Sequence, residues 1–263
     1  MFLLRLSGGL GNQLFQISTA YELNVRSQKN IYIYIGFYKK KLKNNTRRIC
    51  HFNKDVFENL IKVDYNFFLD FFLKFISRIE KLKITKSKQL VNNLDYRLLN
   101  GYFQDFNFFK HNEELLIILR KYFSNNKIQK NTIGLHVRRG DYLLKENKKS
   151  FQSIDLKYYK KALGELEKKV DIFTYDILIF SDDIDWCKEK LKFDYNLKYI
   201  DNESELSDFR LMSSCEHIIT ANSTFSWWAA FINDSENRIV ITPKYWFTDK
   251  NKSFDCPSKW IKI

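Results

Sequence analysis

Residues 132–142 read TIGLHVRRGDY, and this stretch opens the part of the chain that decides the fold. Apolar and β-branched residues at 132–137 predict a buried strand, and charged residues follow directly. Further strands are predicted at 177–180, 197–200, 217–220 and 238–242, with helices at 156–170, 184–191, 203–215 and 223–231. Regular alternation of strands and helices indicates a parallel sheet covered by helices.

The first residues of the chain repeat this pattern once. Residues 2–6, FLLRL, are apolar except for Arg5 and predict a strand. A glycine-rich turn follows at 8–11, and a helix is expected to about Val25. Residues 31–35 alternate as IYIYI and predict a second strand. Glycines at such a turn either let backbone amides approach a ligand or form an ordinary connection, and spacing alone leaves both interpretations open.

Polar side chains follow three of the predicted strands at the point where each strand ends. Ligands of parallel α/β sheets bind beyond the carboxyl ends of the strands, so we expect these clusters to share one edge. The clusters are His136, Arg138, Arg139 and Asp141; Ser181, Asp182 and Asp183; and Asn222, Ser223 and Thr224.

The two adjacent arginines are suited to phosphate, because a guanidinium offers planar, paired donors that stay charged. Neighbouring residues at a strand end point in opposite directions, so one arginine should face the ligand. The other is expected to form a structural ion pair with Asp141. His136 lies two residues before Arg138, shares its face, and is therefore also a candidate ligand contact.

Residues 222–228, NSTFSWW, have the layout of an anion-binding helix start. Capping would explain Ser223 alone, whereas Asn222, Ser223 and Thr224 together favour contact with a phosphate. The D-x-D at 183–185 is open to metal binding, but aspartates at a helix start also cap it. We favour capping and expect no metal.

Composition excludes disordered and collagen-like chains, since 44% of the 263 residues are hydrophobic and only 2 are prolines. The net charge of +13 indicates an anionic partner, although single lysines are more simply read as solvated surface. The four cysteines lie far apart, so neither a zinc site nor a disulfide framework is indicated. With no signal-peptide pattern and no run of about 20 apolar residues, we expect a cytoplasmic protein.

Between Phe67 and Ile79, aromatic and aliphatic residues recur at helical spacing beside lysines. One interpretation is a helix facing the core. The alternative is a helix lying on the inner face of an anionic membrane, which would make the protein peripheral to it.

Three motifs together resemble the inverting alpha-1,2-fucosyltransferases: GGLGNQLFQ at 8–16, HVRRGDY at 136–142 and ANSTFSWW at 221–228. The resemblance implies a GT-B-like α/β fold of two Rossmann-type parallel-sheet halves facing a central cleft. It implies an acceptor-side half at 1–128 and a half at 129–263 that binds GDP-fucose. A metal or other cofactor is not implied.

The resemblance also implies roles for single residues. Arg138 corresponds to the arginine that holds the β-phosphate, His136 lies near the guanosine, and Asn12 lies in the turn facing the sugar. Asp208 corresponds to an aspartate that reads the guanine edge, and Ser223 and Thr224, next to Asn222, reach the diphosphate. Glu146 stands ten residues after His136, where some alpha-1,6 relatives carry a proposed catalytic base, and Asp141 is a weaker candidate.

The expected reaction is inverting transfer of L-fucose from GDP-fucose to the 2-hydroxyl of a terminal galactoside on an oligosaccharide. One alternative is a fucosyltransferase of other regiochemistry. A basic nucleic-acid-binding protein would be a different class, but the basic clusters lie apart from the predicted ligand edge and no nucleic-acid motif is present. We therefore expect no nucleic-acid partner.

Overall fold

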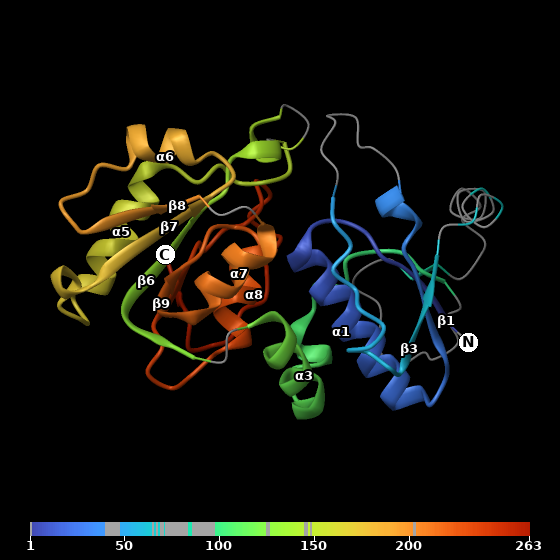
Figure 1. Cartoon of the computed structure of the whole chain (residues 1–263). Coiled ribbons are helices and arrows are strands. Elements are labelled where there is room, and N and C mark those ends of the chain that lie inside the picture. Colours follow the sequence, from blue (N-terminus) through green and yellow to red (C-terminus); the bar gives the residue numbers. More distant parts are fainter. Residues whose placement is uncertain are drawn as a thin grey trace. The chain divides into compact units, whose positions relative to one another are not determined.

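The computed structural model describes residues 2–39, 48–64, 66, 68, 71, 84–85, 98–124, 127–144, 147, 149–201 and 204–263. Two compact units, Met1–Ile118 and Leu119–Ile263, each enclose a parallel sheet (Figure 1). The boundary between them falls within helix α3 (Glu113–Phe123). The prediction of two parallel-sheet α/β halves is confirmed.

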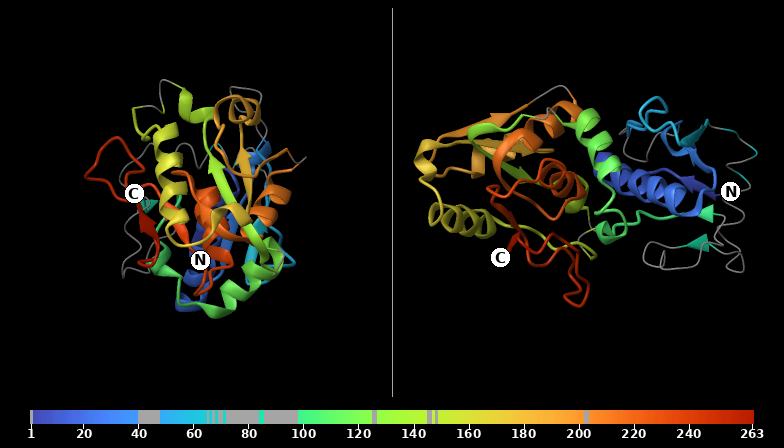
Figure 2. Two further views of the ribbon diagram at one scale, coloured as in Figure 1. Left: turned by 90° about the vertical axis from the view of Figure 1, so that its left-hand side faces the viewer. Right: turned by 90° about the horizontal axis from the view of Figure 1, so that it is seen from below.

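The first unit is built on a sheet of order β3-β2-β1-β5-β4, and every pairing in it is parallel. Helix α1 lies along this sheet (Figure 2) and is buried on most sides, with Leu14, Phe15 and Ile17 in the core. Its elements are β1 (Phe2–Arg5), α1 (Leu10–Ser27), β2 (Ile31–Tyr34), β3 (Leu60–Val63), β4 (Ile84–Thr85) and β5 (Leu98–Leu99).

The second unit contains a parallel sheet of order β11-β10-β9-β6-β7-β8. The strands predicted from 132 onward and the helices between them are all present, with ends shifted by a few residues. The elements are β6 (Gln129–Val137), α5 (Leu156–Glu167), β7 (Asp176–Ser181), α6 (Ile184–Lys190), β8 (Leu197–Ile200), α7 (Glu205–Ser214), β9 (Cys215–Ile219), α8 (Thr224–Ile232), β10 (Val240–Thr242) and β11 (Ile261–Lys262).

Side chains of β6 alternate between two helical layers. Ile133, Leu135 and Val137 belong to a core cluster shared with Tyr159 and Leu163 of α5. On the other face, a Cβ at Gly134 would lie 3.3 Å from the side chain of Met212 in α7, so this position accommodates only glycine without a shift of its neighbours. Helices α5 and α6 thus cover one face of the sheet, and α7 and α8 cover the other (Figure 1).

The strand order reverses direction at β6, because β7 and β8 follow on one side and β9 and β10 lie on the other. Such a reversal leaves an opening at the carboxyl ends of the two strands, here β6 and β9, where the following loops diverge. The first unit has the same feature between β1 and β5. Each sheet therefore carries one position that favours ligand binding.

Candidate active site

The loops after β6, β7 and β9 meet at the carboxyl edge of the second sheet. Val137 pairs with Ser181 in register, so the next residues, Arg138 and Asp182, leave the sheet side by side. On the other side, Leu135 pairs with Ile219, which brings the 222–224 segment next to the same loop. The predicted convergence of the three polar clusters is therefore present.

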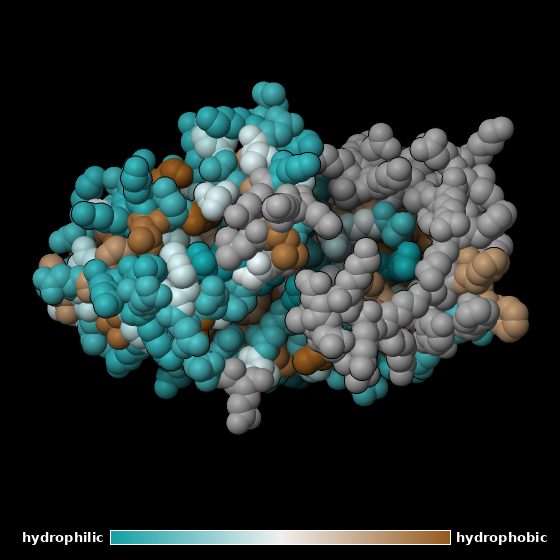
Figure 3. Space-filling view, turned by 90° about the horizontal axis from the view of Figure 1, so that it is seen from above, coloured by the Kyte–Doolittle hydropathy of each residue, from teal (hydrophilic) through white to brown (hydrophobic). Residues whose placement is uncertain are grey.

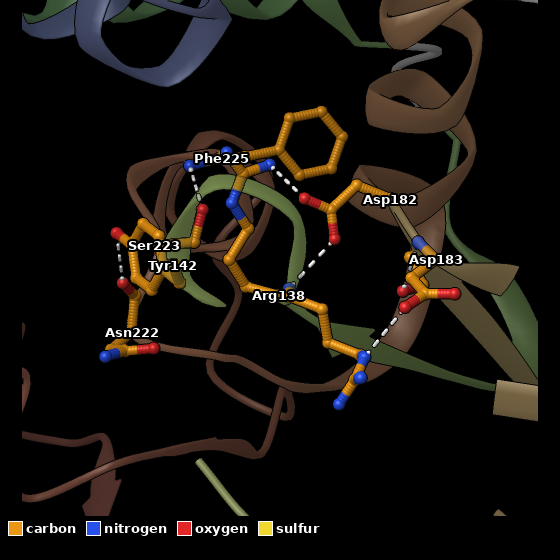
Figure 4. Close-up of polar contacts among 9 residues, drawn as sticks. Arg138, Tyr142, Asp182, Asp183, Asn222, Ser223 and Phe225 are labelled. Atoms are coloured by element: carbon orange, nitrogen blue, oxygen red, sulfur yellow. Dashed lines mark hydrogen bonds and ion pairs between the residues drawn. The ribbon is translucent and has the colours of Figure 1, made fainter. Parts of the chain in front are cut away.

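Arg138 is fixed in place by an aspartate from the neighbouring strand (Figure 4). Its Nη1 lies 2.9 Å from Oδ2 of Asp182, and its guanidinium carbon lies 5.4 Å from the centre of the Tyr142 ring. The other oxygen of Asp182 accepts a hydrogen bond of 2.9 Å from the backbone N–H of Arg139. One carboxylate thus orders both the guanidinium and the turn that carries it.

Gly140 makes this arrangement sterically possible. A Cβ at this position would lie only 2.3 Å from Oδ2 of Asp182, well inside van der Waals contact. The glycine that follows the two arginines is therefore needed so that the Asp182 carboxylate can reach beneath the turn.

Arg139 points to the opposite face, as the strand geometry predicts. Its Nε donates to Oδ2 of Asp183 at 2.9 Å, and its guanidinium carbon lies 3.8 Å from the centre of the Trp186 ring in α6. Its ion pair is with Asp183, and the side chain of Asp141, with which the sequence leads us to expect a pair, lies outside the described residues. Arg139 therefore fastens α6 to the sheet, and Arg138 is the arginine at the ligand edge.

His136 is buried against α8, with its ring centre 5.3 Å from that of Phe225. Burial, reinforced by the positive charge of Arg138, lowers its pKa to about 3, so the imidazole is neutral at neutral pH. Its Nδ1 has no hydrogen-bond partner among the described residues. A buried polar atom left unpaired beside Arg138 is one that a bound ligand could satisfy.

The 222–224 segment combines structural contacts with one unpaired acceptor. The amide of Asn222 donates to the carbonyls of Gln152 and Trp246, while its buried Oδ1 has no partner among the described residues. Ser223 is the N-cap of α8, and its Oγ accepts from the N–H of Phe225 at 3.4 Å. Thr224 is the first residue of that helix.

Asp208 lies in the first turn of α7. The chain enters this helix after leaving β8 at its carboxyl end, so Asp208 is placed on the same edge of the sheet as Arg138. Asn12 belongs to the other unit, in the first turn of α1, where Gln104 Nε2 donates to its Oδ1. Glu146 lies outside the described residues, as does the side chain of Asp141.

The D-x-D aspartates separate as the helix interpretation predicts. Asp183 is the N-cap of α6 and accepts from the N–H of Trp186, whereas the side chain of Asp185 is 94% exposed beside Lys188. Within the described part of the chain, no three His, Cys, Asp or Glu side chains gather closely enough to hold a metal ion.

Most of the Phe67–Ile79 segment lies outside the described residues, although Phe68 and Phe71 are described and exposed. Among the described helices, none combines the length and apolar character that crossing a membrane requires. On the face shown in Figure 3, hydrophilic residues cover most of the described surface of the second unit.

Sequence reasoning did not find how Tyr142 and Asp182 shape the site. Tyr142 OH donates to the carbonyl of Asn222 at 3.0 Å and so joins the loop after β6 to the loop after β9. Its ring stacks on Phe151 at 4.5 Å. Tyr142 stands in the 132–142 stretch and Asp182 in the polar cluster after the 177–180 strand, but their partners lie 80 and 44 residues away, beyond the range of any sequence pattern.

The model described as Glycosyl transferase family 11 matches residues 1–263. This chain belongs to that family. It is 31% identical to the O-antigen biosynthesis glycosyltransferase WbnK of Escherichia coli, over 98% of this chain and 99% of that protein. It is 29% identical to an alpha-1,2-colitosyltransferase of Escherichia coli, over 98% and 97% of the two chains.

A third family 11 relative comes from a mammal. Galactoside alpha-(1,2)-fucosyltransferase 2 of Bos taurus is 29% identical over 51% of this chain and 40% of that protein. The family 11 chain described here is therefore a glycosyltransferase, and Arg138 lies at the carboxyl edge of its second sheet.

Proposed function

We propose that this glycosyltransferase moves L-fucose from GDP-fucose to the 2-hydroxyl of a terminal galactoside, with inversion at the sugar. The observation that carries the proposal is Arg138, held by Asp182 at the β6–β9 switch point beside the start of α8. The names of the relatives, which include alpha-1,2-fucosyl and alpha-1,2-colitosyl transferases, support the donor class and the linkage.

Arg138 would bind the diphosphate of the donor through its guanidinium. The N–H groups at the start of α8 add directed positive charge at the same edge. Asp182 already occupies Nη1, and because it holds the guanidinium in one orientation, binding of the diphosphate requires little further ordering of this side chain. The unpaired Nδ1 of His136 and Oδ1 of Asn222 supply further polar contacts there.

In the proposed reaction, the acceptor oxygen attacks C1 of fucose while the bond from C1 to the β-phosphate oxygen breaks. Negative charge then grows on the leaving GDP, and Arg138 stabilises it. The acceptor hydroxyl loses its proton to a base. We propose Glu146, ten residues after His136, as this base.

A donor screen tests this function. We expect release of GDP from GDP-fucose in the presence of lactose-type galactosides, and linkage analysis of the product should show fucose on the 2-hydroxyl. Because a colitosyltransferase is similar to this chain over nearly its whole length, the screen should also include a nucleotide-activated colitose as donor. Transfer from that donor and none from GDP-fucose would contradict the proposal.

Asp208→Ala should weaken GDP binding about 10- to 100-fold. This factor corresponds to the free energy that hydrogen bonds to a charged group contribute. A carboxylate can accept both N–H groups of the guanine edge, and the partly exposed Asp208 does not hold the core. Calorimetry with GDP measures the effect. Glu205→Ala removes the same charge from the same helical turn and serves as the matched control. Equal affinities in the two variants would assign guanine recognition to another residue.

Transfer should persist in excess EDTA, and Asp185→Ala should keep most activity. Asp183 is engaged by Arg139 and Trp186, and Asp185 faces solvent, so the pair does not form the converging oxygen ligands that Mg²⁺ or Mn²⁺ requires. Initial rates with and without chelator provide the measurement. Activity that EDTA abolishes and Mn²⁺ restores would show that the reaction depends on a metal.

A further inference from the structure

A segment near the C-terminus runs antiparallel to the end of the loop that follows β6. The N–H of Gln152 donates to the carbonyl of Trp246 at 3.0 Å. The N–H of Thr248 donates to the carbonyl of Ser150 at 3.1 Å. We call residues 246–248 the strap, because they hold the far end of the loop that begins at the site.

The strap is itself fixed by the core of the second unit. Trp246 is 3% exposed, and its ring stacks on that of Phe254 with the centres 3.8 Å apart. The amide of the buried Asn222 donates to the carbonyls of both Gln152 and Trp246. One side chain therefore fastens the strap and the loop to the segment that precedes α8.

A series of ring contacts leads from the strap to Arg138. The ring centre of Phe247 lies 5.8 Å from that of Phe151. The ring of Phe151 stacks on Tyr142 at 4.5 Å, and the two planes differ by 20°. The guanidinium carbon of Arg138 lies 5.4 Å from the centre of the Tyr142 ring. We call Tyr142, Phe151 and Phe247 the aromatic column.

The Tyr142 ring complements the ion pair that holds Arg138. Asp182 contacts Nη1 and so fixes one edge of the planar guanidinium. The face of an aromatic ring attracts a cation, so Tyr142 limits the tilt of that plane. Tyr142 has little freedom of its own, because its hydroxyl donates to the carbonyl of Asn222 (Figure 4) and Phe151 packs on its ring.

We propose that Tyr142 is a positioning residue for Arg138 and that the aromatic column couples the strap to the orientation of the guanidinium. Donors that are oriented in advance stabilise a growing negative charge without reorganisation during the reaction. Phe151 and Phe247 act on the transfer step through Tyr142. The inference rests on the proposed binding of the donor diphosphate by Arg138.

Two substitutions of Tyr142 separate its ring from its hydroxyl. Tyr142→Leu removes the ring and should lower kcat for transfer about 3- to 30-fold, the range that corresponds to a cation–π contact. Tyr142→Phe keeps the ring and should restore most of that loss. Initial rates of GDP release measure both variants. A Tyr142→Phe enzyme as slow as Tyr142→Leu would overturn the proposal, because the hydroxyl would then be the active group.

Phe247→Ala removes the end of the column that belongs to the strap. We expect kcat to fall about 3- to 10-fold, since the Tyr142 ring loses part of its support. Phe193→Ala is the matched control, because Phe193 is also half-buried in the second unit but lies between α6 and β8, at the amino edge of the sheet. It should lower the melting temperature while kcat stays within about twofold of wild type.

Combination with Arg138→Lys distinguishes positioning from a general loss of stability. A lysine has no guanidinium plane to orient, so Tyr142→Leu and Phe247→Ala should each lower kcat less than about twofold in the Arg138→Lys enzyme. Equal losses in the wild-type and Arg138→Lys backgrounds would overturn the proposal. So would kcat values that follow only the melting temperature, with Phe193→Ala as slow as Phe247→Ala.

Failure of the proposed function looks different from failure of the column. In that case the wild-type enzyme itself transfers no fucose from GDP-fucose, before any variant is compared. If it transfers colitose instead, the same variants and the same combination with Arg138→Lys are measured with that donor.

Discussion

Arg138→Lys should lower kcat/KM for fucosyl transfer about 100- to 1000-fold, equivalent to about 2.7–4 kcal/mol of transition-state stabilisation. The charge is retained, but an ammonium cannot keep the ion pair with Asp182 and also give planar, paired donors to a diphosphate. Initial rates with GDP-fucose and a galactoside, followed as GDP release, measure the loss. Near-normal turnover of the Arg138→Lys variant would show that Arg138 does not stabilise the leaving diphosphate.

Arg139→Lys is the matched control, because the same substitution is made one residue along on the opposite face. Lysine there loses the stacking on Trp186 and the directed bond to Asp183. We expect it to lower the free energy of unfolding by about 1 kcal/mol while transfer is largely kept. The reverse pattern, with Arg139→Lys inactive and Arg138→Lys active, would exchange the roles of the two arginines.

Arg238→Met should lower the free energy of unfolding by about 3–5 kcal/mol, because it leaves several buried carbonyls without a donor. The buried guanidinium donates to the carbonyls of Ser213 and Cys215, where α7 meets β9, and to those of Glu216 and Ala230. Burial lowers its pKa to about 10, which still leaves it charged at neutral pH. One side chain therefore satisfies the backbone where α7, α8 and β9 come together.

Urea unfolding followed by tryptophan fluorescence provides the measurement for Arg238→Met, since Trp227 and Trp228 lie in the adjoining helix α8. Lys168→Met is the control. Lys168 is an exposed residue paired with Glu165, and its loss should cost less than about 1 kcal/mol. An Arg238→Met protein within about 1 kcal/mol of wild type would show that water or other donors satisfy these carbonyls.

Local patterns account for most of the second sheet. Strand β8 begins and ends where predicted. The apolar residues at 132–137 correctly predicted β6, the strand that precedes the two arginines. Asp183 was expected to cap a helix, and it does. These features depend on residues within a few positions of one another, so the sequence contains the information directly.

The sequence analysis did not predict some elements, for two different reasons. Helix α3 could have been predicted from its N-terminus, because Asn112 caps it, with Oδ1 accepting from the N–H of Leu115, and two glutamates stand in its first turn. Strands β5 and β11 had no such signal. Each is two residues long and is held by pairing with other strands, β5 with β1 and β4, and β11 with β10.

The sequence by itself determined the alternating α/β architecture, the strand end that carries Arg138 and the opposite directions of the two arginines. All three follow from local periodicity and backbone geometry. Only the tertiary structure decided that Asp182 holds Arg138 and that Gln104 holds Asn12. Those pairs are 44 and 92 residues apart, and they meet because parallel pairing brings separate strand ends to one edge, a contact that no local pattern encodes.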